Sequence, residues 1–321
     1  MRAESAPTLD DVLIARQRIA GVVTRTPLER SDALSADAGS DVFLKLECWQ
    51  RTRSFKLRGA YNALAALSAA ERARGLVTAS AGNHGQAVAL AARELGARAT
   101  IFVPADAPAM KKDRIRRLGA ELRDDAPDYD AAEAAAAAEA KRSGRVFVHA
   151  FSAAAVVAGQ GTIALELLED LPALHQVVVP VGGGGLISGI GLVLRRLAPR
   201  VKVIGVQSVE TRAVYEALRA GRLVDVPVTP TLADGLAGCT DAVSVARVQA
   251  NVDDVVLVEE SAIADAIAVL YARDGVVAEG SGAVGVAAIR SGAVRVDGPT
   301  ALVVSGGNID GGRLADILST R

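Results

Sequence analysis

The stretch QRTRSFKLRGA at residues 50–60 joins a predicted strand to a predicted helix and carries Lys56 at the junction. Ser54 is a residue type that caps helices, and the apolar residues after it recur at helical spacing, which places Lys56 in the first turn of a helix. The helix dipole and burial both lower the pKa of a lysine in that position. Such a lysine is a nucleophile that forms Schiff bases with aldehydes. The alternative, from this stretch alone, is a solvated surface lysine.

Around this stretch the chain alternates short apolar strands, glycine turns and helices. Continuous apolar strands are typical of a parallel sheet buried on both faces, so we predict an α/β fold. The predicted strands are 42–47, 76–80, 99–103, 145–149, 176–181, 201–207, 255–259 and 301–305. The predicted helices are 8–20, 86–95, 110–118, 130–142, 162–171, 186–197, 213–220 and 262–272. No repeat or flexible linker interrupts the pattern, and we expect two closely packed lobes.

The composition limits the classes of partner. Of the 321 residues, 50% are hydrophobic but only 3% are aromatic, so the core must consist mainly of Ala, Val, Leu and Ile. The net charge is −1 with acidic and basic residues well mixed, and we therefore expect no nucleic-acid or membrane partner. The N-terminus lacks an apolar signal segment and no uncharged run reaches about 18 residues, which favours a cytoplasmic protein.

Metal and disulfide sites are not expected. The two cysteines, Cys48 and Cys239, lie outside any CxxC pattern, and the chain has only three histidines. Two cysteines are too few for a disulfide framework, and the pattern does not fit a zinc site. We expect both thiols to be free.

Four turns follow predicted strands, at 80–85, 182–186, 234–238 and 305–308. Ligands of open α/β sheets bind at the carboxyl ends of strands. The four glycines from 182 to 185 also open a helix, where backbone N–H groups can cradle a phosphate; the alternative is a tight turn alone. A dinucleotide fingerprint is excluded because Ile187 stands where its third glycine would be, and no Gly-Lys-Ser/Thr follows as in a P-loop.

Two further turns suit the remaining parts of a ligand. The polar turn at 80–84 opens a helix and suits a carboxylate, although Asn83 and His84 can instead act as capping residues. Ser305 can donate to a ligand nitrogen or bond its own backbone. Together the turns and Lys56 imply a ligand with one phosphate, an aldehyde and a partner carboxylate. Pyridoxal phosphate (PLP) joined to an amino acid fits all three.

The motifs resemble those of a known family. They are Ser-Phe-Lys-Leu-Arg-Gly-Ala at 54–60, Ser-Ala-Gly-Asn-His-Gly-Gln-Ala at 80–87, the glycine tetrad with leucine at 182–186, Thr-Leu-Ala-Asp-Gly at 231–235 and Ser-Gly-Gly-Asn-Ile-Asp at 305–310. The chain from about residue 8 onward resembles, in the same motif order, the serine/threonine dehydratases among the fold-type II PLP enzymes, a family that includes serine racemase.

The resemblance implies the architecture. It implies two open, twisted, mostly parallel sheets flanked by helices, with the active site between a large and a small domain. We expect the large domain at 1–52 and 150–321 and the small domain at 53–149. The resemblance also implies a homodimer or higher homo-oligomer.

The resemblance assigns a role to each motif. Lys56 would bind PLP covalently and then act as the base at the substrate Cα, and Phe55 would pack against the cofactor ring. Asn83 would bond the ring hydroxyl and Ser305 the pyridine nitrogen. The phosphate would be held by Gly182, Gly183, Gly184, Gly185 and Leu186. The substrate would be bound by Ser80, Ala81, Gly82, Asn83, His84 and Gly235.

The implied reaction is β-elimination of water from L-threonine or L-serine, which gives 2-oxobutanoate or pyruvate and ammonia. Serine racemases carry a second serine where this chain has Ala81, so we expect weak or no racemisation. Gln207, Thr211 and Ala213 stand where racemases bind a divalent cation, and they are poor ligands for it. The sequence ends at Arg321, soon after the last predicted strand, so we expect no C-terminal regulatory domain.

The sequence leaves the substrate and the reaction open in three ways. The substrate can be another β-hydroxy amino acid, as in the hydroxyectoine pathway or for 3-hydroxyaspartate. No Arg or Lys lies between Asp234 and Ser244 to receive the second carboxylate of hydroxyaspartate. The motifs are also compatible with a serine racemase-like enzyme and with an inactive PLP-binding relative.

Overall fold

The computed structural model describes residues 6–107, 109–227, 229–238 and 240–320. Cys239, whose thiol we expected to be free, lies outside these residues. Cys48 is free and buried. Burial raises the pKa of the Cys48 thiol to about 12, which makes it a poor nucleophile.

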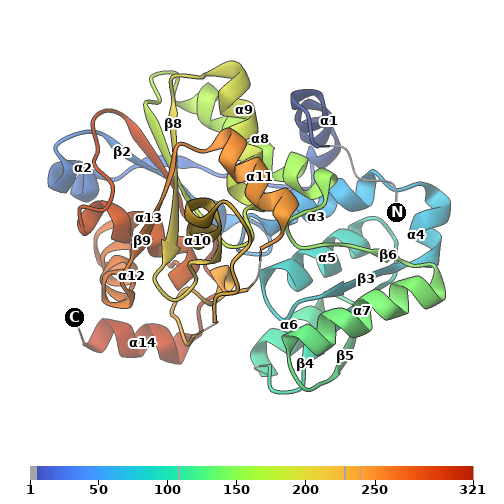
Figure 1. Ribbon diagram of the computed structural model, residues 1–321. Helices are drawn as coiled ribbons and strands as arrows, with labels where there is room; N and C mark the ends of the chain where they lie inside the picture. The colour runs from blue at the N-terminus through green and yellow to red at the C-terminus, as the bar shows by residue number, and fades with distance from the viewer. Residues whose placement is uncertain (1–5, 108, 228, 239, 321) are drawn as a thin grey trace. The chain divides into compact units, whose positions relative to one another are not determined.

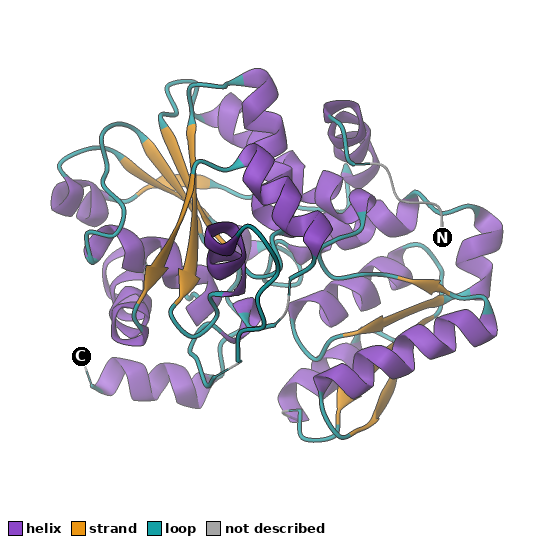
Figure 2. Ribbon diagram, in the orientation of Figure 1, coloured by secondary structure: helices purple, strands orange, loops and turns teal. Residues whose placement is uncertain are grey.

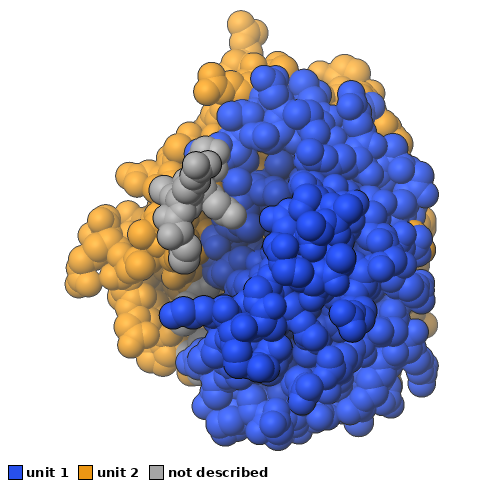
Figure 3. All heavy atoms as spheres, turned by 90° about the vertical axis from the view of Figure 1, so that its right-hand side faces the viewer, with its two compact units in different colours: residues 1–24, 56–160 blue, residues 25–55, 161–321 orange. Residues whose placement is uncertain are grey.

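Contacts between residues divide the chain into two units, which Figure 3 colours separately. Unit 1 consists of residues 1–24 and 56–160, and unit 2 consists of residues 25–55 and 161–321. One crossing from unit 2 to unit 1 falls at the peptide bond between Phe55 and Lys56.

These units differ from the predicted domains mainly at the N-terminus. The prediction placed residues 1–52 in the large domain, whereas the structure assigns residues 1–24 to unit 1. Helix α1 (Leu9–Ile19) packs against α3 (Lys56–Ala65) of that unit, and its Ile19 joins the unit 1 core. A capping box formed by Thr8 and Asp11 starts α1.

Unit 1 is built on a parallel sheet with the strand order β5-β4-β3-β6 (Figure 1). Its strands are β3 (Leu76–Ala79), β4 (Ala99–Pro104), β5 (Glu121–Ala126) and β6 (Val146–Phe147). Its helices are α1, α3, α4 (Ala69–Arg74), α5 (Asn83–Glu94), α6 (Ala109–Arg117), α7 (Tyr129–Ser143) and the first part of α8 (Ala154–Asp170).

The central strand β3 is buried on both faces because helices cover each side. Leu76 packs in one apolar cluster with Ala87 and Val88 of α5, whereas its neighbour Val77 packs in another with Ala132 of α7. Successive side chains of a strand point to opposite faces, so α5 and α7 lie on opposite faces of the sheet (Figure 2).

Strand β5 was not predicted from the sequence. Its residues ELRDDA are mostly polar, and it pairs only with β4 at the edge of the sheet. Edge strands are often rich in charge, which protects them from pairing with other chains. A search for continuous apolar stretches therefore misses this strand.

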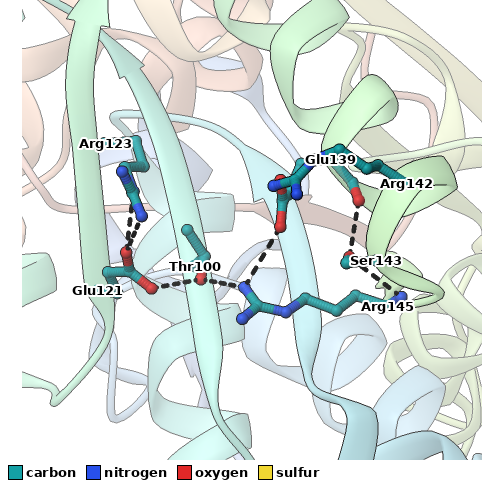
Figure 4. Close-up of polar contacts among 7 residues, drawn as sticks. All are labelled: Thr100, Glu121, Arg123, Glu139, Arg142, Ser143 and Arg145. Carbon is teal, nitrogen blue, oxygen red and sulfur yellow. Dashed lines mark hydrogen bonds and ion pairs between the residues drawn. The ribbon is translucent and has the colours of Figure 1, made fainter.

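Polar side chains tie the amino-terminal ends of these strands together (Figure 4). Thr100 of β4 donates to Glu121 of β5 over 2.9 Å and accepts from Arg145, which precedes β6, over 2.8 Å. Arg123 also bonds Glu121, and Glu139 of α7 lies 3.9 Å from Arg145. The hydrogen bond from Thr100 lowers the pKa of Glu121. The cluster lies at the end of the sheet opposite to the turn at 80–85, so it stabilises the sheet.

Unit 2 is built on a larger sheet with the order β1-β2-β10-β7-β8-β9, in which only β1 is antiparallel (Figure 1). Its strands are β1 (Leu28–Arg30), β2 (Val42–Lys45), β7 (Gln176–Pro180), β8 (Lys202–Ser208), β9 (Asp254–Val258) and β10 (Thr300–Val303). Its remaining elements are α2 (Asp32–Ala38), η1 (Glu47–Trp49), α9 (Gly185–Leu197), α10 (Ala213–Ala220), η2 (Asp234–Leu236), α11 (Ala242–Asn251), α12 (Glu260–Asp274), α13 (Gly280–Arg290) and α14 (Gly311–Ser319).

Strand β7 is entirely buried because helices cover both faces of this sheet too. On one face, Val178 and Val206 pack in a large apolar cluster with Val284 and Ala287 of α13. On the other face, Gly205 of β8 leaves room for Ile187 of α9, since a Cβ there would lie 3.0 Å from the Ile187 Cδ1. Helix α13 was missed in the sequence because its first turn, Gly-Ser-Gly, has the composition of a loop.

Among the described residues, no helix combines the length and the apolar character that a bilayer crossing requires.

The crossing of α3 and α8 within unit 1 depends on two glycines. A Cβ on Gly159 would lie 2.5 Å from the Arg58 carbonyl oxygen and 2.6 Å from the Gly59 Cα. A Cβ on Gly59 would lie 2.7 Å from the Val156 carbonyl oxygen. Backbone atoms cannot move aside as a flexible side chain can, so any side chain here separates the helices.

We predict that Gly159→Ala lowers the free energy of unfolding by about 1–3 kcal/mol, because overpacking forces the backbone of α8 away from α3. The measurement is urea denaturation followed by circular dichroism. The matched control is Gly311→Ala at the start of α14, where a Cβ meets nothing within 4 Å. Equal stability of the two variants would contradict the packing argument.

Candidate functional site

Lys56 is the first residue of α3, as its sequence predicts. Its Nζ donates a hydrogen bond to the carbonyl oxygen of Ala150 over 3.0 Å. Ser54 was expected to cap this helix, but its Oγ is buried and makes no hydrogen bond within the described part of the chain. Instead, the backbone of Ser54 forms a β-bridge with Gly306. The helix start is therefore held by backbone pairing.

The residues before Lys56 are held on the loop that follows β10, and both segments belong to unit 2. The amide of Phe55 donates to the carbonyl of Ser305 over 3.0 Å, and the amide of Gly307 donates to the carbonyl of Arg53 over 2.9 Å. Arg53 has a φ of 56°, an unfavourable conformation for a non-glycine residue. Tertiary hydrogen bonds hold this conformation, and such strain tends to occur at functional sites.

The turn at 80–85 connects β3 to α5. Helix α5 begins at Asn83, three residues earlier than predicted, with Gly82 as its N-cap residue. The Ser80 Oγ accepts a hydrogen bond from the Gly82 amide over 3.2 Å. A Cβ on Gly85 would lie 2.2 Å from the Ser80 carbonyl oxygen, so only glycine allows the turn to close this tightly. Ser80, Ala81, Gly82 and Asn83 are half-buried at the positive end of the α5 dipole, a suitable place for a carboxylate.

His84 is buried in the first turn of α5, and its hydrogen-bond partner fixes the tautomer of its neutral ring. The Nε2 lies 3.0 Å from the carbonyl oxygen of Val148, which can only accept, so Nε2 carries the proton. The Nδ1 is buried and has no hydrogen-bond partner in the described ranges 6–107, 109–227, 229–238 and 240–320. Burial, followed by the nearby charge of Lys56, lowers the pKa of His84 to about 3.

The glycine tetrad joins β7 to α9 in unit 2. Gly184 is the N-cap residue of α9 with a φ of 94°, which favours glycine. A Cβ on Gly184 would lie 3.0 Å from the Val248 Cγ2, and one on Gly182 would lie 3.3 Å from the Leu236 Cα. Gly183 accepts a hydrogen bond from the Thr240 hydroxyl over 3.4 Å. The tetrad thus presents backbone groups without side chains at the N-terminus of α9.

Gly185 and Leu186 form the first turn of α9 and are both buried. Ser188, two residues beyond the predicted set, has a buried Oγ that finds no hydrogen-bond partner among the described residues. A serine inside a glycine-rich helix start, as in Gly-Gly-Leu-Ile-Ser, was the sequence signal for this residue.

Ser305, Gly235 and the start of α13 lie together in unit 2. The Ser305 Oγ is buried and donates to the carbonyl oxygen of Ser281 over a long 3.4 Å. The Ser281 Oγ is also buried, and no residue that the structure describes forms a hydrogen bond with it. A Cβ on Gly235 would lie 2.8 Å from this Oγ. Sequence reasoning missed Ser281, for which the Gly-Ser-Gly at 280–282 was the available signal.

Gln207, one of the residues considered for a divalent cation, uses its side chain for other contacts. The Gln207 side chain donates to the carbonyl oxygens of Val181 and Thr211 over 3.1 and 2.6 Å and accepts from the Tyr215 amide over 2.8 Å. Within the described part of the chain, no group of three or more His, Cys, Asp or Glu side chains could hold a metal ion.

A family model described as "Pyridoxal-phosphate dependent enzyme" matches residues 19–306. The chain belongs to this family.

Relatives of the PLP-dependent family cover nearly the whole chain. An L-threonine ammonia-lyase of Thermotoga maritima is 48% identical over 304 residues, which cover 94% of this chain and 76% of the relative. The "L-threonine dehydratase catabolic TdcB" of Escherichia coli K12 is 38% identical, covering 96% of this chain and 95% of the relative. The solved structure of maize serine racemase is 34% identical with a TM-score of 0.93, and the match covers 98% of each chain.

Within each unit, the chemical groups on offer suit parts of the cofactor of the PLP-dependent family. The tetrad 182–185 offers amides without Cβ atoms at the start of α9, which suits a phosphate. Lys56 offers a primary amine, and Ser305 offers a buried hydroxyl whose hydrogen bond to the Ser281 carbonyl is long. The family match shows that the protein is a PLP-dependent enzyme.

We predict that the imidazole of His84 stays neutral and protonated at Nε2 from pH 8 down to pH 5, because its pKa is about 3. The measurement is long-range ¹H–¹⁵N NMR of the histidine rings, with His84→Gln for assignment. The lowered pKa also means that His84 contributes stability above its unfolded pKa of about 6.5, and that this stability is lost as the pH falls toward 3. A His84 titration midpoint between pH 5 and 8 would show that the ring is not buried as described.

Proposed function

We propose that the protein is a PLP-dependent ammonia-lyase that eliminates water from L-threonine or L-serine to give 2-oxobutanoate or pyruvate and ammonia. The observation that carries this proposal is the position of Lys56 at the start of α3, where its Nζ donates to the carbonyl oxygen of Ala150. The same unit contains the 80–84 turn, which leads into α5. Relatives named L-threonine ammonia-lyase and L-threonine dehydratase support it.

In this proposal each part of the cofactor has a partner. Lys56 would bind the aldehyde carbon, and the phosphate would be held by Gly182, Gly183, Gly184, Gly185 and Leu186. Ser305 would bond the pyridine nitrogen, Asn83 would bond the ring hydroxyl, and Phe55 would pack against the ring. The bound cofactor supplies an electron sink for the substrate Cα.

The chain's own residues then position the substrate and move the proton. Ser80, Ala81, Gly82, Asn83 and His84 receive the substrate carboxylate at the start of α5, where the amides and the helix dipole favour an anion. Neutral His84 donates its only N–H to the backbone, so its ring brings no charge to this site. Lys56 takes the proton from Cα as a general base. Gly235 leaves space for the substrate side chain.

Ser305 favours elimination over reactions that need a long-lived carbanion. A neutral hydroxyl does not hold the pyridine nitrogen protonated, as a carboxylate would. The electron sink would then be weaker, which would favour prompt loss of the β-hydroxyl group, with a proton, as water.

Serine racemase activity is a second candidate, because the maize serine racemase structure matches with a TM-score of 0.93. Ala81 counts against it, since a methyl group can neither give nor take a proton. Chiral analysis of the serine pool after incubation with L-serine distinguishes the two. The motif resemblance also leads us to propose a homo-oligomer in the cytoplasm.

The first test is release of 2-oxobutanoate from L-threonine by the PLP-loaded protein. We expect Lys56→Ala to lower kcat by roughly 10³-fold or more, because both the covalent anchor and the general base are removed. The matched control is Lys141→Ala on α7, an exposed lysine of the same unit. Elimination that persists in Lys56→Ala, or that is lost equally in Lys141→Ala, would refute the assignment.

The second test concerns the phosphate cradle. We expect Gly184→Ala to weaken PLP binding by about tenfold or more, because a side chain at a φ of 94° distorts the amides at the start of α9. Gly221→Ala is the matched control, because it carries the same kind of strain at a φ of 65° with open space around it. Equilibrium dialysis measures the Kd of PLP for both. A similar loss of affinity in the two variants would argue against the cradle.

A further inference from the structure

A short segment of unit 1, residues 148–152, contacts Lys56, strand β3 and helix α5. It follows β6 and leads to α8. The amide of Val148 donates to the carbonyl of Val77 over 2.9 Å. The Val148 carbonyl oxygen accepts from the Thr78 Oγ1 over 2.8 Å and bonds the His84 Nε2 over 3.0 Å. The start of the segment is thus anchored to β3 and α5.

The middle of the segment presents a carbonyl oxygen to Lys56. The Ala150 oxygen accepts from the Lys56 Nζ over 3.0 Å. An amine that has taken a proton is an ammonium ion, and a hydrogen bond from an ammonium ion to a carbonyl is stronger than one from a neutral amine. This bond therefore favours Lys56 in its protonated state.

His149 folds the segment into the turn that directs this carbonyl. Its Nδ1 lies 2.9 Å from the Ser152 Oγ, 3.2 Å from the Ser152 amide and 3.4 Å from the Phe151 amide. Amides can only donate, so Nδ1 is an unprotonated acceptor and the ring is neutral. The ring packs edge-on against Phe147 and Phe151, with centroids 6.2 and 4.6 Å apart. Its Nε2 lies 3.9 Å from Glu133, beyond hydrogen-bond distance.

We propose that His149 is a positioning residue for the general base: by gathering the donors of residues 151 and 152 on its Nδ1, it holds the Ala150 carbonyl against Lys56 and so stabilises the lysine after it has taken a proton. This inference rests on the proposed role of Lys56 as the base. His149 acts through the backbone and needs no contact with the substrate.

The test compares two substitutions of His149. An asparagine can place its Oδ1 where the Nδ1 lies and still accept, whereas a leucine fills the space without accepting. We expect His149→Leu to lower kcat for L-threonine about tenfold with little change in KM, and His149→Asn to restore most of the activity. Ser152→Ala, which removes only the hydroxyl donor, should have a smaller effect of the same sign, and it serves if His149→Leu does not fold.

A second measurement needs neither substrate nor turnover. The full-length protein, freed of cofactor, is acetylated with a trace of acetic anhydride at pH 8, and mass spectrometry compares Lys56 with the exposed Lys141 in the same molecules. Loss of the stabilising carbonyl leaves more of Lys56 as free amine, so His149→Leu should raise the Lys56 to Lys141 ratio about tenfold, and His149→Asn should return it to the wild-type value.

An unchanged labelling ratio in both His149→Leu and Ser152→Ala would overturn the proposal. So would an equal effect of the leucine and asparagine variants, because that would indicate a packing role for the ring. If the wild-type protein released no 2-oxo acid, the proposed function would fail, while the labelling ratio would still test the link between His149 and Lys56.

Discussion

The two candidate binding turns, one in each unit, depend on the same constraint: a helix that starts directly after a parallel strand leaves its first amides without partners inside the helix. This occurs after β3, where α5 begins at Asn83, and after β7, where α9 begins at Gly185. Each start lies at the carboxyl end of a strand in the interior of its sheet. The first suits a carboxylate and the second a phosphate. Both groups are anions, and the positive helix ends can bind them with few charged side chains.

Glycine is what keeps these helix starts accessible. Gly85 allows the 80–85 turn to close on the Ser80 carbonyl, and Gly184 adopts a left-handed conformation that other residues resist. Two histidines near Lys56 likewise carry no charge. In its neutral form, His84 donates from one ring nitrogen to the 148–152 segment. Neutral His149, which belongs to that segment, accepts with one ring nitrogen from donors inside it. Neither ring therefore places an imidazolium beside Lys56, the base in our proposal.

Much of the fold was predictable from the sequence, and the failures share a cause. The strands β3, β4, β7 and β8 were recognised as apolar runs because they are buried on both faces. Strand β5 and helix α13 were missed, since the first is a polar edge strand and the second begins with Gly-Ser-Gly. Their structure comes from pairing with β4 and from packing on the sheet of unit 2, neither of which leaves a local signal.

The sequence by itself determined the α/β class, the position of Lys56 in the first turn of a helix, the glycine turns after β3 and β7, and the PLP-dependent family, because these depend on short motifs and local spacing. Only the tertiary structure decided what those residues contact. Ser54 pairs with Gly306 instead of capping α3, and Lys56 meets the carbonyl of Ala150, 94 residues further along the chain. The physical reason is that hydrogen bonds between distant segments form only when sheets and helices have packed, and residue spacing along the chain does not encode which carbonyl will face which donor.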